Sequence, residues 1–137
     1  MKDWEIIHTY TRKQAINDGV QVRIPDQLIE EAGIKYPMFV TRNVWDEYLS
    51  VPVELVGYQD LDGRIWDMLF MFAMEARKIS GDRLIFQVVF QILKDRKWQN
   101  NEKGDECYRE VTLYAVIGAM DFDDPSPAIT IMKPGED

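Results

Sequence analysis

The stretch Leu84-Ile85-Phe86-Gln87-Val88-Val89-Phe90-Gln91-Ile92 decides the fold class. One set of alternate residues in it is wholly apolar, whereas the other set admits the two glutamines, Gln87 and Gln91. A period of two residues is typical of a β-strand that has one face on the core. The stretch therefore predicts a half-buried strand.

Two more strands are expected after this one, because the alternation returns in Cys107 to Ile117 and in Ile129 to Met132. The polar segment between the first two strands, Asp95 to Glu106, contains Asn100-Asn101-Glu102-Lys103-Gly104, which signals a hairpin turn. The second half of the chain thus predicts an antiparallel meander of about three strands.

The first half has the residue spacing of helices instead. Thr11 and Gln14 predict a capping box at the start of a first helix, which Gly19 ends. The longest helix is expected from about Gly63 to Ile79, with Asp62 as its cap. The other expected elements are a short strand, Val20 to Ile24, and two helices, Gln27 to Ala32 and the segment after Thr41.

The longest helix leaves only a narrow polar stripe, so we expect it to be buried on most sides at the centre of the domain. Since helices come first and strands second, the sequence predicts one α+β domain over residues 1–137. Its N-terminal helices are expected to pack on one face of a C-terminal antiparallel sheet of about three strands.

Composition limits the class of protein. The 137 residues are 46% hydrophobic and 29% charged, a globular balance, and no linker or repeat divides them. The single cysteine, Cys107, cannot form an internal disulfide, and no apolar leader follows Lys2 and Asp3. The most apolar run, Ile65 to Ala76, is too short to span a bilayer. We expect a cytoplasmic protein without a membrane segment.

The net charge of −8 argues against direct nucleic-acid binding, which needs a basic face. An acidic surface serves solubility in many proteins, and its alternative use is to mimic nucleic acid toward a basic partner. No long run of one sign supports the mimic. The carboxylates that would form it are Asp26, Glu30, Glu31, Asp46, Glu47, Asp60, Asp62, Asp121, Asp123, Asp124, Glu136 and Asp137.

Patterns for catalysis and metal binding are missing from the sequence. It has no glycine-rich phosphate loop, no nucleophile elbow and no paired-histidine zinc motif. One histidine, His8, and one cysteine cannot build the usual nitrogen and sulfur metal site. Asp60-Leu61-Asp62-Gly63 lacks the further carboxylates of a calcium loop. We therefore expect no catalytic residue, no metal and no cofactor.

Arginines at helix starts are the unusual feature. Arg12, Arg42 and Arg64 each stand at the beginning of an expected helix, where the positive end of the dipole disfavours a cation. In one interpretation each guanidinium turns away and pairs with a carboxylate. The candidate partners are Asp18, Asp46, Asp67 and the C-terminal pair Glu136 and Asp137, whose docking would tie down the tail.

Two other interpretations of these arginines stay open. In the first, two or three helix starts converge, and their N–H groups and guanidinium groups, together with Asp67, form a site for phosphate or carboxylate. Alternatively, the three arginines are scattered surface residues.

Trp98 is the other unusual residue, because it stands among polar neighbours in the expected hairpin. In one interpretation Trp98 packs across the hairpin onto a residue such as Tyr108. In the other it anchors a protein partner, as tryptophans often do at interface centres.

Four motifs occur in order: Tyr10-Thr11-Arg12-Lys13-Gln14-Ala15-Ile16-Asn17-Asp18-Gly19-Val20, Thr41-Arg42-Asn43-Val44-Trp45, Gly63-Arg64-Ile65-Trp66-Asp67, and Thr130-Ile131-Met132-Lys133-Pro134-Gly135-Glu136-Asp137. Through them the chain, from about Ile6 onward, resembles an uncharacterised bacterial family that is often carried by plasmids, phages and conjugative elements. The resemblance implies a mobile-element setting and transfers no catalytic residues.

The sequence thus predicts a non-enzymatic protein that acts by binding, with a protein as its partner. The alternatives are an anion-binding protein or enzyme that uses the arginines, and an acidic nucleic-acid mimic that acts against host defence. The oligomeric state does not follow from the sequence.

Overall fold

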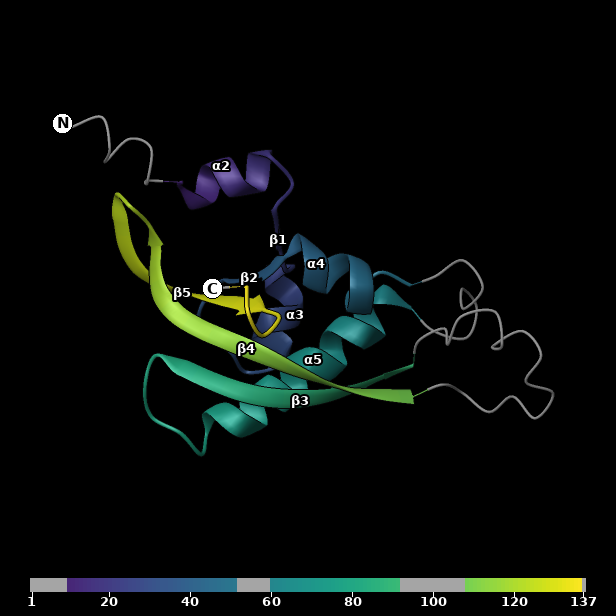
Figure 1. Ribbon diagram of the computed structural model, residues 1–137. Coiled ribbons are helices and arrows are strands. Elements are labelled where there is room, and N and C mark those ends of the chain that lie inside the picture. The colour runs from purple at the N-terminus through teal and green to yellow at the C-terminus, as the bar shows by residue number, and fades with distance from the viewer. Residues whose placement is uncertain (1–9, 52–59, 92–107, 137) are drawn as a thin grey trace.

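The computed structural model describes residues 10–51, 60–91 and 108–136 as an α+β fold, which confirms the predicted class (Figure 1). Its sheet has five strands in the order β1-β2-β5-β4-β3. The segments around His8, Trp98 and Cys107 lie outside the described residues. The strands are β1 (Gln21–Arg23), β2 (Met38–Thr41), β3 (Arg83–Gln91), β4 (Tyr108–Asp121) and β5 (Asp124–Met132).

The prediction of three antiparallel strands is wrong, because the N-terminal half adds two strands and makes the sheet mixed. β2 pairs antiparallel with β1 and parallel with β5, where Met38 lies opposite Ile129. Met38, Phe39 and Val40 are all fully buried. A strand buried on both faces is a short continuous apolar run without alternation. β2 therefore has no two-residue alternation by which it could be recognised in the sequence.

The hairpin of β3 and β4 confirms the two alternating stretches. Their antiparallel register runs from Arg83 opposite Val116 to Gln91 opposite Tyr108. β5 then pairs antiparallel with β4. One face of this hairpin enters the core through the side chains Leu84, Phe86, Val88, Phe90, Val111, Leu113 and Ala115.

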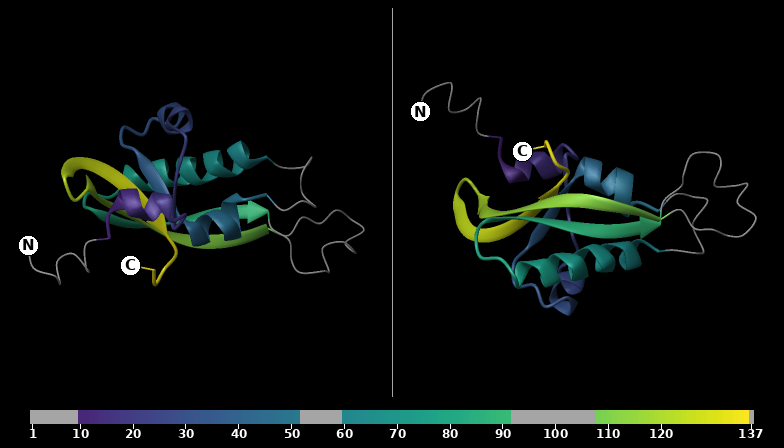
Figure 2. Two further views of the ribbon diagram at one scale, coloured as in Figure 1. Left: turned by 90° about the horizontal axis from the view of Figure 1, so that it is seen from above. Right: turned by 60° about the horizontal axis from the view of Figure 1, so that its bottom comes forward.

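Helix α5 (Leu61–Ala76) differs from the expected central helix in its start and in its burial. Asp60, not Asp62, is the cap, since its side chain accepts a hydrogen bond from the Gly63 N–H. The helix covers one face of the sheet beneath β3 and β4 (Figure 2). Its buried residues form one stripe, Arg64, Ile65, Met68, Leu69 and Phe72, whereas its exposed apolar residues are Trp66, Phe70, Met71 and Met74.

The shorter helices do not all lie on one face, contrary to the prediction. They are α2 (Arg12–Asn17), α3 (Asp26–Glu31), and α4 (Arg42–Val44), which continues as a π-helical turn, η1 (Trp45–Leu49). α3 lies on the same side as α5, and α2 lies on the opposite side (Figure 2). Arg12 of α2 contacts Phe39, whose neighbours in β2 point to the core under α5. Alternate residues of a strand point to opposite faces, so β2 is covered from both sides.

Two adjacent residues of α5 test this orientation. Leu69→Ala should lower the free energy of unfolding by about 2–5 kcal/mol, because Leu69 is fully buried and its truncation leaves a cavity. Phe70→Ala removes a larger side chain that is 51% exposed and should cost less than about 1 kcal/mol. Urea denaturation measures both values. Equal losses would contradict the one-sided packing of α5.

Candidate functional site

The start of α2 explains how an arginine can be its first residue. Thr11 and Gln14 form the predicted capping box. The Gln14 N–H donates to Thr11 Oγ1 at 3.0 Å, and the Thr11 N–H donates to Gln14 Oε1 at 2.9 Å. In addition, the carboxylate of Asp121 accepts hydrogen bonds from the backbone N–H groups of Arg12 and Lys13, each at 3.1 Å. A carboxylate from the β4–β5 turn therefore compensates the positive end of this helix.

The Arg12 guanidinium turns from the helix toward the sheet. It donates to the Met120 carbonyl at 2.6 Å, to Gln21 Oε1 at 2.9 Å and to Thr130 Oγ1 at 3.0 Å. Its central carbon lies 4.3 Å from the centre of the Phe39 ring, a cation–π contact. Burial lowers the pKa of Arg12, and the nearby charge of Asp121 opposes this shift. Arg12 thus holds α2 onto β1, β2, β4 and β5.

Arg42 and Arg64 also bind backbone carbonyls, Arg42 just after the end of α2 and Arg64 at the end of η1. Arg42 donates through Nε to the Gly19 carbonyl at 2.7 Å and forms an exposed ion pair of 3.6 Å with Asp46. Arg64 is only 4% exposed, and its Nη1 donates to the Tyr48 carbonyl at 2.8 Å and the carbonyl of residue 50 at 3.3 Å. Burial lowers the pKa of Arg64. A guanidinium at these carbonyls compensates the negative end of a helix.

The three arginines are therefore not brought together in one cleft. Each is held by different carbonyl groups, which the sequence did not indicate as partners. Of the carboxylates expected to pair with them, Asp46 contacts Arg42. Asp67 lies one turn after Arg64 on α5, and desolvation by neighbouring protein atoms raises the pKa of its carboxyl group, although the residue is exposed. The donors of these arginines thus serve the fold.

The tail is tied down as far as residue 136, although not to an arginine. The carboxylate of Glu136 accepts a hydrogen bond of 2.9 Å from Thr41 Oγ1 and one of 3.2 Å from Asn43 Nδ2. It also accepts the Lys133 N–H at 2.7 Å. Thr41 in turn caps α4 through the Val44 N–H. Glu136 therefore docks at a helix start, and its expected partner in docking, Asp137, lies outside the described residues.

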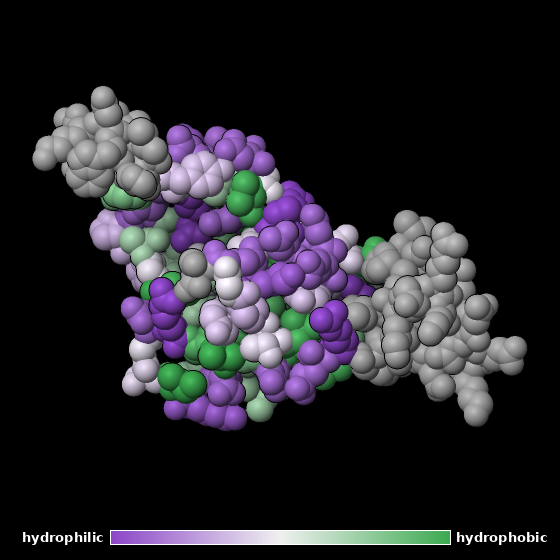
Figure 3. Space-filling model, viewed as in Figure 1, coloured by the Kyte–Doolittle hydropathy of each residue, from purple (hydrophilic) through white to green (hydrophobic). Residues whose placement is uncertain are grey.

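Apolar side chains also reach solvent on the sheet face opposite α5. Ile85 and Val89 of β3 are 54% and 51% exposed, and Tyr114 and Val116 of β4 are half-buried beside them. The space-filling view shows hydrophobic surface over β3 and β4 on this face (Figure 3).

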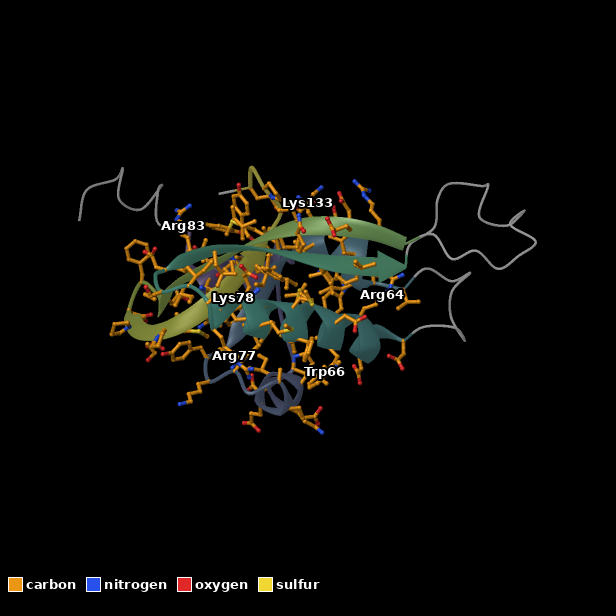
Figure 4. The ribbon with its side chains drawn as sticks, turned by 90° about the horizontal axis from the view of Figure 1, so that it is seen from below. Arg64, Trp66, Arg77, Lys78, Arg83 and Lys133 are labelled. Atoms are coloured by element: carbon orange, nitrogen blue, oxygen red, sulfur yellow. The ribbon has the colours of Figure 1, made fainter. Side chains whose placement is uncertain are left out.

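A second apolar surface covers the solvent side of α5. We call Trp66, Phe70, Met71 and Met74 the α5 ridge; their exposed fractions range from 37% to 51%. Trp66 lies on the side of α5 where α3 packs, and Arg64 lies toward the sheet (Figure 4). A cavity of about 260 Å³ lies between α5 and the segment after α3; Ile34, Phe72 and Ala73 are among its lining residues, and no ridge residue is.

Charged groups of both signs border the α5 ridge: carboxylates lie at its N-terminal end and on α3, whereas Arg77 and Lys78 are exposed at its C-terminal end. Asp62 and Asp67 are exposed on α5 itself. On the neighbouring α3, Asp26, Glu30 and Glu31 are exposed. The carboxylates at the N-terminal end of the ridge and on α3 form an acidic rim along part of this apolar strip, and such a rim attracts cationic groups at the edge of an apolar contact.

The sequence interpretation missed this surface because it assigned all apolar residues of the long helix to the core. Trp66, Phe70 and Met74 follow one another at intervals of four, which places them along one line of the helix. Ile65, Leu69 and Phe72 already form the stripe that faces the sheet. The sequence did contain a signal for this surface: a second line of apolar residues beside the stripe that already faces the core.

The comparisons with known proteins add no relative: no family model, no curated protein and no solved structure matches the chain. The resemblance to the mobile-element family therefore stays a prediction. Within residues 10–51, 60–91 and 108–136 no helix is long and apolar enough to cross a membrane. Over the same ranges, no cluster of three or more His, Cys, Asp or Glu side chains is arranged to hold a metal ion.

The docking of Asp121 onto α2 predicts a pH dependence. Bonds from the Phe122, Lys13 and Arg12 N–H groups lower the pKa of Asp121 below its ordinary value. Because the folded pKa is the lower one, this carboxylate stabilises the fold above about pH 4 and ceases to do so as the pH falls through the lowered pKa. Asp121→Asn should lower the melting temperature at pH 7, and the difference from wild type should shrink below pH 4.

The control for this measurement is Asp123→Asn, in the same turn, because Asp123 accepts none of these three bonds. Thermal melts of both variants over a pH series make the comparison. A constant difference between wild type and Asp121→Asn at every pH would contradict the proposed charge effect.

Arg64 offers a second test. Arg64→Met keeps an apolar stem but leaves the buried carbonyl of Tyr48 without its donor, which should cost about 1–3 kcal/mol of unfolding free energy. Lys78→Met is the control, since Lys78 forms an exposed ion pair with Glu75 and should change stability by less than about 1 kcal/mol. Chemical denaturation compares the two, and an equally small loss in both would show that Arg64 is not needed at η1.

Proposed function

We propose that this protein is a non-enzymatic binding protein that holds an apolar segment with basic flanks, supplied by a protein partner, on the α5 ridge. One observation carries the proposal: Trp66, Phe70, Met71 and Met74 expose large apolar surfaces side by side on one helix. Contiguous apolar patches of this kind mark interaction sites more often than single exposed residues do.

The residue types of the ridge suit recognition. Tryptophan is enriched among the residues that dominate binding energy, and methionine adapts its shape to varied apolar partners. Fully burying one such side chain on binding contributes about 1.5–3 kcal/mol. The cavity beside Ala73 gives a partner side chain a place to insert.

The acidic rim supports a partner segment whose flanks are basic. The net charge of −8 raises the encounter rate with a basic segment and repels the phosphates of nucleic acid. The mobile-element setting implied by the resemblance is part of this proposal, and the partner there would be a protein of the host or of the element.

The two alternative functions gain no support from the contacts. The guanidinium groups of the three arginines are engaged by carbonyl oxygens, so the fold uses donors that an anion site would need. Several carboxylates of the suggested mimic surface also have internal partners. They are Asp26, Asp46, Glu47, Asp60, Asp121 and Glu136.

Peptide selection tests the proposal. A random peptide library is panned on the folded protein, and the dissociation constants of enriched peptides are measured by fluorescence anisotropy. We expect enriched sequences that combine apolar residues with Lys or Arg. Trp66→Ala and Phe70→Ala should each weaken their binding by about tenfold or more, because anchors of this type carry most of an interface's energy.

Phe122→Ala is the matched control, because Phe122 is 72% exposed but lies at the β4–β5 turn, far along the chain from the ridge. It should leave the dissociation constants unchanged. Enriched peptides that are acidic, or that bind both ridge variants as tightly as wild type, would refute the proposed function.

A further inference from the structure

The strand β3 forms one edge of the sheet. Its nine residues pair with β4 on one side, and within the described part of the chain no strand pairs with its other side. Figure 4 views the molecule from this side, with β3 in front of β4 and α5 below it. The opposite edge is β1, which has only three residues and ends on the charged Arg23.

From Leu84 to Gln91, β3 lacks the sequence features that protect edge strands from pairing. Natural edges are usually short or carry prolines, bulges or charged side chains. Between Leu84 and Gln91 there is no proline and no charged residue. The register with β4 is continuous from Arg83 to Gln91, so no bulge turns the edge away. Within the described residues, the edge from Leu84 to Gln91 is therefore long, regular and uncharged, which suits it for pairing with another strand.

The sequence of β3 is complementary to itself when two copies run antiparallel about Gln87. In that register Ile85 of one copy lies opposite Val89 of the other, and Phe86 lies opposite Val88. The first pair is on the exposed face of the sheet, and the second is on the core face. Cross-strand pairs of aliphatic and aromatic residues stabilise a sheet by about 0.2–1 kcal/mol each.

Charges are also complementary in this arrangement. Arg83 and Glu110 are exposed and share the outer face of β3 and β4, because Glu110 lies opposite Val89. In this register Arg83 of the second copy lies opposite Gln91 of the first. Glu110 of the first copy is then two strand spacings away from that Arg83 and two residues farther along the strand. Strand spacing and rise place their Cα atoms roughly 12 Å apart. At this separation the attraction between the two charges is partly screened by salt, and it favours the antiparallel register without a direct ion pair.

We propose that two copies of this chain associate through their β3 edges, in antiparallel register centred on Gln87, and join their sheets into one continuous sheet. The occupant of the edge is thus a second copy. The exposed apolar strip of Ile85 and Val89 continues across the junction. This inference goes beyond the proposed function and does not rest on it, because it is argued from the residues of β3 and β4 alone.

The oligomeric state is the first measurement. Sedimentation equilibrium should give twice the chain mass of 16.1 kDa for the wild type at micromolar and higher concentrations. The double variant Ile85→Lys, Val89→Lys should give the chain mass, because lysines on an edge repel a second copy. Both side chains are more than half exposed, so the variant keeps the fold, which circular dichroism verifies.

Phe70→Lys is the control, because it places a lysine on the α5 ridge and should remain dimeric. A monomeric wild type overturns the proposal. A dimer that survives the β3 double variant and is broken by Phe70→Lys overturns it too, and would assign self-association to the ridge.

The register is tested by cysteine crosslinking in a Cys107→Ser background. Gln87→Cys places two cysteines directly opposite each other, within the Cα separation that a disulfide needs, and mild oxidation should give a covalent dimer. Ile85→Cys alone should not crosslink, because its counterpart lies four residues along the partner strand. Adding Val89→Cys to it should restore the crosslink. Crosslinking by Ile85→Cys alone, or failure of Gln87→Cys, would refute the register.

Discussion

The burial of β2 on both faces is the constraint on which the rest of the fold depends. This short strand joins the two halves of the chain, since it pairs with β1 on one side and with β5 on the other. Met38 and Val40 need cover from the α5 side, and Phe39 needs cover from the opposite side. α2 supplies that second cover through the guanidinium of Arg12 on the Phe39 ring. The position of the first helix therefore follows from a strand about twenty residues later.

The arginines at the helix starts follow one rule. Two helix starts bind carboxylates from distant segments. Asp121 of the β4–β5 turn accepts the N–H of Arg12 at the start of α2, and Glu136 of the tail binds at the start of α4. The guanidinium groups meanwhile bind carbonyl oxygens, as Arg64 does at the end of η1. Carboxylates therefore lie at helix N-termini, and Arg42 and Arg64 bind carbonyls at helix C-termini, each at the favourable pole of a helix dipole, whereas Arg12 binds a carbonyl of β4. These contacts connect elements that are not neighbours in the chain.

The sequence was informative where structure depends on near neighbours. Alternation predicted β3 and β4, and Thr11 with Gln14 predicted the capping box, because strand faces and helix caps are set within a few residues. It did not show that β2 lies beside β5, or that Arg64 binds the Tyr48 carbonyl, because both depend on pairing between distant segments. The exposure of Phe70 depends in the same way on how many elements cover α5. A period reveals which residues share a face, but not whether that face is covered.

The two exposed apolar surfaces differ in charge, and this difference separates their roles. The α5 ridge has carboxylates at its N-terminal end and on the neighbouring α3, and these favour a basic partner. β3 carries no carboxylate from Arg83 to Gln91, so no carboxylates of the two strands face each other in the pairing. Antiparallel pairing at β3 would place both α5 helices on the same face of the joined sheet. A dimer of this kind presents two ridges side by side, and a partner with two suitable segments would bind it with an avidity that one chain cannot reach.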